Sequence, residues 1–230
     1  MLIFKDSILG VVSGVQINLS DLLRKGDWIE IERHNADGTV MDITLTSVKV
    51  RNWDNTISVI PAYDLITNSF RNWRGMQDSG VRRIKRAMYI DQKTVRFLTP
   101  DEIASLSKIK ILAPYLEAKI HEIVGEESKA GLLGIAQGSG SPDMLNARHL
   151  TNIGTFRAYC TAYLRSCKTV AQDMTLMTRL LEPTPLGLPL EVYAFANTTV
   201  WEDFEGIQAD ILDHLIAAMP EFGLELYQRQ

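Results

Sequence analysis

Four histidines are the side chains of this chain best suited to acid–base or metal chemistry: His34, His121, His149 and His214. No common spacing relates them, and a general base or a metal ligand needs a second positioned group beside it. The sequence also contains no Gly-x-Ser-x-Gly elbow, no His-Glu-x-x-His pair and no Gly-x-x-x-x-Gly-Lys phosphate loop. We therefore predict that the chain is not an enzyme and that it has no catalytic, cofactor-binding or metal-binding residue.

Two cysteines, Cys160 and Cys167, are the candidates for redox chemistry. Both fall in a predicted helix, on one face and about 10 Å apart along its axis. That distance is too long for a disulfide, and there is no second cysteine pair to complete a zinc site. We expect both to be reduced, structural thiols, as is usual in the cytosol.

A basic cluster with aromatic neighbours is the strongest remaining candidate site. Phe70 and Trp73 are interleaved with it, and its members are Arg71, Arg74, Arg82, Arg83, Lys85 and Arg86. On a small β-barrel such a cluster is typical of an RNA-binding ring or a single-strand-binding domain. The chain as a whole is acidic, with a net charge of −4, whereas nucleic-acid-binding domains are usually basic. We therefore predict ion pairing near a domain junction and no nucleic-acid partner.

An apolar segment with two glycines, Ile8 to Leu19, lies near the start of the chain. It is shorter than the roughly 20 residues that cross a bilayer, and it lacks the basic start of a signal peptide. Gly10 and Gly14 are spaced as in closely packed helices. The segment suits a helix at a membrane interface, and we expect the first 25 residues to be disordered, detached from their own domain's core or packed against another copy. An ordinary helix that covers the core is the alternative.

Alternation of apolar and polar residues predicts short β-strands over residues 26–74. Asp37-Gly38 is predicted to form a turn between two strands, and Asn52 to Asn55 a second turn. The alternation changes phase at Thr46-Ser47, which predicts a bulge or a sharp bend. Four or five short, bent strands in this length favour a small β-barrel.

The rest of the chain is richer in helix and begins with a predicted linker, Gly75 to Gly80. Thr99 to Glu102 has the residues of a capping box that starts a helix, and Thr199 to Glu202 is assigned a second one. The predicted order is strand, helices, two strands, helix and a last strand at Leu224 to Tyr227, with a flexible loop at Gly138 to Pro142. This order favours a ferredoxin-like α/β domain.

Several short motifs resemble the small-conductance mechanosensitive channel family. They are Arg24 to Ile31, Asp37 to Val40 and Val59 to Pro61. Three further segments are similar to the miniconductance branch of that family: Val50 to Thr56, Ser69 to Gly75 and Leu181 to Pro185. Together these motifs extend the resemblance over nearly the whole chain.

The resemblance implies an α+β chain in three parts. Residues 1–25 would be the distal half of the third transmembrane helix, an amphipathic helix at the membrane interface. Residues 26–74 would be a small Sm-like β-barrel domain, and residues 75–230 a ferredoxin-like α/β domain with an insertion near residues 125–148. The pore-lining helix would precede residue 1.

In that family these parts form the cytosolic vestibule of a homo-oligomeric channel, typically of seven subunits, in the bacterial inner membrane. The channel opens under membrane tension and releases ions and osmolytes on hypo-osmotic shock, and no cofactor is implied. Gly10 and Gly14 are expected to support packing of the interfacial helix, and Gly38 is expected to lie in a β-domain turn at a subunit interface. The alternative is a soluble oligomeric scaffold or an Sm-like RNA-binding ring.

Overall fold

The chain divides into two compact units, Met1–Gly80 and Val81–Gln230, and each has its own hydrophobic core. A computed structural model describes residues 5–132 and 149–228. The loop predicted at Gly138 to Pro142 and most of the insertion expected near residues 125–148 lie outside the described residues. The fold class is α+β with antiparallel sheets and a helix first, as predicted.

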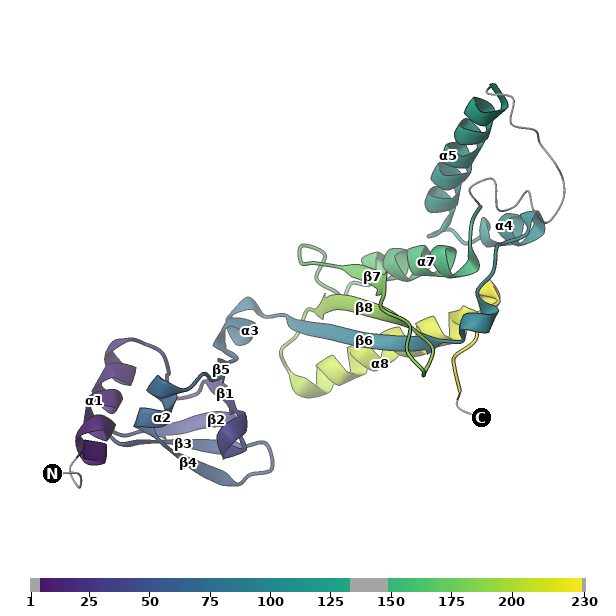
Figure 1. The fold of residues 1–230 in the computed structure, drawn as a ribbon. Helices are drawn as coiled ribbons and strands as arrows, with labels where there is room; N and C mark the ends of the chain where they lie inside the picture. Colours follow the sequence, from purple (N-terminus) through teal and green to yellow (C-terminus); the bar gives the residue numbers. More distant parts are fainter. Residues whose placement is uncertain (1–4, 133–148, 229–230) are drawn as a thin grey trace. The chain divides into compact units, whose positions relative to one another are not determined.

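The first unit is an antiparallel sheet of five strands preceded by helix α1 (Lys5–Leu19), and the strand order is β4-β3-β2-β1-β5. The strands are β1 (Trp28–Ile31), β2 (Ala36–Ile43), β3 (Ser47–Asn52), β4 (Ile57–Pro61) and β5 (Arg71–Asn72). Three short helices connect or follow them: η1 (Glu32–His34), α2 (Ala62–Thr67) and α3 (Arg74–Ser79). Apolar side chains from alternate strand positions form the core, and α1 and α2, which contact each other, add Ile17 and Leu65 to it (Figure 1).

Gly38 lies inside β2, so the predicted turn at Asp37-Gly38 is wrong. The chain turns instead at η1 and at Asn35, whose φ of 46° is left-handed. Asp37 stays in the strand because its carboxylate accepts a hydrogen bond from Trp28 Nε1 (2.7 Å) and its backbone N–H donates to Asn52 Oδ1 (3.0 Å). These bonds join β2 to the strand on each side, and a local turn would break them.

Three further predictions concern the connections between strands and the end of this unit. The sharp bend predicted at Thr46-Ser47 is confirmed, since the chain reverses there in a hairpin between β2 and β3 that is closed by the Thr44 N–H bond to the Ser47 carbonyl oxygen (2.8 Å). The alternative prediction, a bulge, is wrong for this position, because the irregularity of the sheet falls between Val40 and Asp42. The linker predicted over Gly75 to Gly80 ends where the first unit ends, at Gly80, and most of it is helical, since α3 occupies Arg74–Ser79. The turn at Asn52 to Asn55 is confirmed, with the Asn55 N–H bonded to the Asn52 carbonyl oxygen (3.0 Å).

The second unit is a three-stranded antiparallel sheet in the order β6-β8-β7, with helices α7 and α8 packed on one face. The strands are β6 (Arg82–Ile90), β7 (Met177–Leu180) and β8 (Leu188–Ala196), and the long helices are α5 (Ala113–Leu132), α7 (Asn152–Ser166) and α8 (Trp201–Ala218). The short helices are η2 (Gln92–Thr94), α4 (Pro100–Leu106) and η3 (Met219–Phe222). Figure 1 shows α7 and α8 running along the sheet.

The capping box at Thr99 is confirmed as the start of α4. Thr99 Oγ1 accepts from the Glu102 N–H (3.3 Å), and the Glu102 carboxylate accepts from the Thr99 N–H (2.8 Å). Hydrogen bonds from Arg96 and from Thr99 lower the pKa of Glu102 to about 2. The second capping box, at Thr199, is wrong: α8 begins after Val200, and no side chain caps it.

The last predicted strand, Leu224 to Tyr227, is also wrong. A single antiparallel bridge joins Ile90 to Leu226, and the described chain forms no continuous ladder there. The bridge lies beside the edge strand β6, which is where a ferredoxin-like sheet places its fourth strand. Two backbone hydrogen bonds flank the bridge, from the Asp91 N–H to the Glu225 carbonyl oxygen (2.9 Å) and from the Tyr227 N–H to the Tyr89 carbonyl oxygen (2.8 Å). The segment therefore has the predicted position and pairs with the end of β6, but over too short a length to form a strand.

Candidate functional site

Helix α1 is docked on the sheet of the first unit by one of its faces. Gly10, Ser13, Gly14 and Ile17 recur at helical spacing and are all buried, and the Ile17 side chain is 1% exposed within the core. The prediction that this helix is detached from its own domain's core is therefore wrong. The alternative left open by the sequence, a helix that covers the core, describes this face.

Of the two glycines of α1, Gly14 lies closer to the connection between β2 and β3. A Cβ atom built on Gly14 would lie 2.7 Å from the Leu45 Cα and would overlap the Leu45 carbonyl group. A Cβ atom on Gly10 would lie 3.8 Å from the Thr46 Cγ2, an ordinary van der Waals contact. The two glycines share a face, but only Gly14 is required by the present packing.

The opposite face of α1 is apolar and exposed. Its side chains are Ile8, Val11, Val12, Val15 and Leu19, and the exposed fraction reaches 56% at Val12 and 83% at Leu19. No charged residue occurs from Ser7 to Ser20. A helix that is apolar on both faces is typical of one covered on both sides. The sheet covers the inner face, so the outer face has the character of a contact with lipid or with another protein surface.

None of the helices in the described ranges combines the length and the apolar character that crossing a membrane requires.

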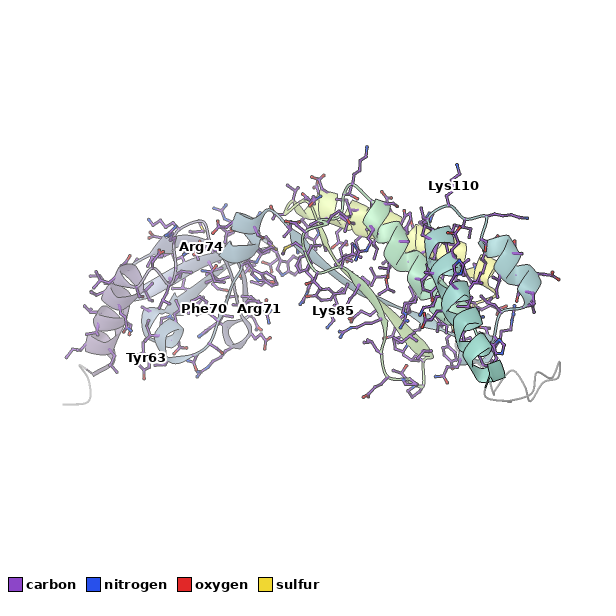
Figure 2. The ribbon with its side chains drawn as sticks, turned by 90° about the horizontal axis from the view of Figure 1, so that it is seen from above. Tyr63, Phe70, Arg71, Arg74, Lys85 and Lys110 are labelled. Atoms are coloured by element: carbon purple, nitrogen blue, oxygen red, sulfur yellow. The ribbon has the colours of Figure 1, made fainter. Side chains whose placement is uncertain are left out.

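A buried carboxylate fixes the segment that joins α1 to β1. Asp27 is 5% exposed and accepts hydrogen bonds from the Arg24 N–H (2.8 Å), Asn72 Nδ2 (3.0 Å) and Arg74 Nε (2.9 Å). The Arg74 guanidinium also donates to the carbonyl oxygen of Asp21 (3.3 Å). The Arg74 side chain, which Figure 2 labels, therefore holds both ends of the joining segment.

The charges at this junction are matched. Burial by itself raises the pKa of Asp27, but hydrogen bonds from Arg74, Arg24 and Asn72 outweigh it and hold the pKa below its ordinary value. The same bond raises the pKa of Arg74. Both groups are therefore ionised at neutral pH, and the pair connects the end of α1 to the β5–α3 region at the end of the sheet unit.

Two of the histidines have a polar partner, but in separate units. His34 Nε2 lies 2.7 Å from Asp64 Oδ2, in the wall of a hollow of 560 Å³ that also contains the Arg71–Glu30 ion pair. His214 Nε2 lies 2.7 Å from the Tyr159 hydroxyl. In the hollow, His34 pairs with Asp64 and Arg71 pairs with Glu30.

The basic cluster is divided between the two units. Arg71 pairs with Glu30 and Arg74 with Asp27, both within the first unit, where Figure 2 labels the two arginines. Arg82 belongs to the second unit and lies over the ring of Trp201, with 4.3 Å from its Cζ to the ring centre. The basic residues that are close in the sequence are therefore divided between the two units and do not form a single surface on either one.

Comparison with known proteins gives a family match over the region that contains this junction. Residues 6–75 match the model described as the β-domain of mechanosensitive ion channels. This chain carries a mechanosensitive channel β-domain. The match includes all of the apolar segment of α1, so helix and sheet belong to one family unit.

Solved channel structures share the fold over almost the whole chain. A cryo-EM structure of Arabidopsis thaliana MSL1 is 13% identical, with a TM-score of 0.62, and the match covers 98% of this chain and 60% of that one. The closed-state crystal structure of Helicobacter pylori MscS is 12% identical, with a TM-score of 0.57, and the match covers 100% of this chain and 65% of that one. The chain thus spans somewhat under two thirds of the length of these channels.

Sequence reasoning about this mechanosensitive channel β-domain named Gly10, Gly14 and the basic residue Arg74, but missed Asp27 and its pairing with Arg74. A signal was present, because the two residues lie in separate motifs that both resemble the channel family. Their pairing crosses 47 positions of sequence, so the spacing alone did not indicate it. The expected role of Gly38 at a subunit interface stays a prediction.

Proposed function

We propose that this chain is the cytosolic vestibule region of a tension-gated ion channel, with α1 lying along the membrane surface. The observation that supports this proposal best is that the two faces of α1 differ. The inner face is docked on a mechanosensitive channel β-domain, and the outer face is apolar and exposed. In this proposal residues 1–25 are the interfacial helix, residues 26–74 the β-domain and residues 75–230 the vestibule-forming α/β domain.

The arrangement suits a part that passes tension from lipid to protein. Each exposed Val, Leu or Ile of the outer face gains about 1.5–3 kcal/mol when fully buried in an apolar phase. The inner face cannot slide freely, because Gly14 is in backbone contact and Asp27 and Arg74 hold the end of the helix. Tension shifts the equilibrium toward the open state to the extent that this state occupies more membrane area.

The whole protein in this proposal is a homo-oligomer, a heptamer as is typical of the family, in the bacterial inner membrane. It releases ions and osmolytes on hypo-osmotic shock and belongs to the miniconductance branch. It has no catalytic role. The subunit contact inferred below rests on the homo-oligomeric part of this proposal.

A soluble oligomeric scaffold is the second candidate, and the buried inner face of α1 favours it. In a scaffold the outer face of α1 would be covered by protein. The two functions therefore differ in what a charge on that outer face would disturb.

The experiment compares Val12→Glu with Gln16→Glu in the full-length protein, because both add one negative charge to exposed positions of α1. Val12 belongs to the apolar outer face, whereas Gln16 is an exposed polar position outside it. Patch-clamp recording in cells without other mechanosensitive channels should show stretch-activated currents whose pressure threshold rises for Val12→Glu and not for Gln16→Glu. Equal thresholds for the two variants, or no stretch-activated current from the unmodified protein, would contradict the proposal.

A further inference from the structure

The sheet of the second unit has one face without a helix layer among the described residues. Core residues such as Ile84, Val192 and Ala194 point to α7 and α8, so the alternate residues point the other way. Six of these define what we call the open sheet face: Arg83, Lys85, Met177, Arg179, Tyr193 and Phe195. It is a mixed aromatic and basic surface.

The charge of the open sheet face is positive. Arg83, Lys85 and Arg179 are cations, and among the described residues the one carboxylate that lies between them on these strands is Glu191, which is 3% exposed. Glu191 accepts from Arg179 Nε at 2.8 Å and lies 3.9 Å from Lys85 Nζ. Arg83 lies over the ring of Tyr193 and has no ion-pair partner that the structure describes. The open sheet face therefore carries more positive charges than its one carboxylate can neutralise.

The other side of the same unit is acidic. Helix α8 contains no lysine or arginine, and Phe204, Gln208, Ile211 and Leu215 point to the core. The carboxylates on its exposed surface define the acidic helix face: Glu202, Asp203, Asp210 and Asp213. Asp213 points directly away from the buried residues, since 100° per residue places it opposite Phe204 and Leu215. A solvated helix usually carries both signs of charge, and this one does not.

The two faces lie on opposite sides of a two-layer unit, the sheet on one side and α8 on the other. Opposite charges on opposite sides allow one copy to bind the next in the same orientation. A contact between two different patches is heterologous, and such contacts close into a ring when the rotation between copies allows it. Complementary potentials of this kind fix register and suppress wrong pairings.

We propose that the open sheet face of one copy binds the acidic helix face of the next copy around the channel ring. The inference rests on the proposed homo-oligomeric function and names the partner and both surfaces. The aromatic side chains supply apolar contact, with Tyr193 and Phe195 packed edge to face at 5.8 Å between ring centres. Arg83, Lys85 and Arg179 of one copy then face the α8 carboxylates of its neighbour.

Cysteine cross-linking of the full-length protein tests the contact without changing any charge. Met177→Cys lies on the open sheet face and Ala209→Cys is exposed on α8 between the carboxylates. A chain with both added cysteines should form a ladder of cross-linked multimers. A chain with only one added cysteine should not, because a heterologous contact brings two different surface positions together. The single variants retain Cys160 and Cys167 and so measure their background. Absence of a ladder from an intact ring would overturn the inference.

Charge reversal provides the second measurement, made in the chain that carries both cysteines. Arg83→Glu alone and Asp213→Lys alone should each lower the ladder yield about tenfold, and the two together should restore it. Lys110→Glu is the matched control, since Lys110 is exposed and sits between α4 and α5, off both faces; Figure 2 labels it together with Lys85. An equal loss of yield in the control and in Arg83→Glu would refute the charge pairing.

Two other outcomes are decisive. If a single-stranded RNA probe binds the protein at submicromolar concentration, and Arg83→Glu abolishes that binding while the ladder is unchanged, the open sheet face is an RNA surface and the inference fails. Stretch-activated current is scored separately in the unmodified protein. Stretch-activated current without a cross-linked ladder would support the channel proposal and overturn the proposed contact. A ladder without current would support the contact and overturn the channel proposal.

Discussion

The substitution Gly14→Ala tests how tightly α1 is docked on the sheet. Gly10→Ala is its control, because it makes the same change on the same face of the same helix. In a helix interior, Gly to Ala gains about 1 kcal/mol from backbone entropy. Gly10→Ala should keep this gain, since its new methyl group would meet the Thr46 Cγ2 at 3.8 Å. Gly14→Ala places the methyl group 2.7 Å from the Leu45 Cα, against backbone that cannot rotate away.

The expected cost at Gly14 follows from that overlap. Overpacking of a rigid contact costs about 1–3 kcal/mol, and backbone against backbone belongs at the upper end. After the helix gain of about 1 kcal/mol is subtracted, Gly14→Ala should destabilise α1 docking by about 2 kcal/mol. The two variants should then differ by about 3 kcal/mol in the free energy of opening the helix from the sheet.

Hydrogen–deuterium exchange of the α1 amides measures this directly, because it reports opening of one region within a two-unit chain. About 2 kcal/mol corresponds to roughly 30-fold faster exchange in Gly14→Ala, while Gly10→Ala should exchange at the unmodified rate or several-fold more slowly. Peptides from β6 and β8 in the second unit should be unaffected and serve as the internal control. Equal exchange in the two variants would show that α1 does not rest on Leu45 as described.

Two further predictions concern the sheet unit. Gly38→Val should disrupt the β2–β3 pairing within each copy before it affects a subunit contact, because a Cβ atom at position 38 would lie 2.7 Å from the Asn52 Cα. Circular dichroism should therefore show a lower melting temperature for this unit. An unchanged melting temperature together with a weakened ring would instead support the interface role. Asp27→Asn should cost about 2–3 kcal/mol at pH 7 by leaving Arg74 without its buried partner. Because the folded-state pKa of Asp27 is lowered, its contribution is present above about pH 4, the ordinary carboxyl pKa, and is lost as pH falls through the folded value. Denaturant unfolding should therefore show the two proteins converging in acid, and a constant difference down to pH 2 would contradict this account.

The sequence by itself determined the features that depend on neighbours along the chain. The capping box at Thr99 needs only residues three positions apart, and the apolar segment of α1 is visible because helical spacing is local. The alternation that predicted a small β-structure, and the order of elements that predicted an α/β unit, also follow from local periodicity. The motifs similar to the channel family lie in the same regions.

Only the tertiary structure decided what these elements contact. Gly38 is in a strand because Trp28 and Asn52, on two neighbouring strands, hold Asp37 extended. Asp27 meets Arg74 across 47 positions, and Gly14 meets Leu45 across a helix and a sheet. Turn signals such as Asp-Gly are weak local preferences, worth less than the hydrogen bonds and buried area that long-range packing adds. For that reason the sequence identified α1 as an apolar helix, while the packing of its inner face decided which of its surfaces is left for a membrane or a partner.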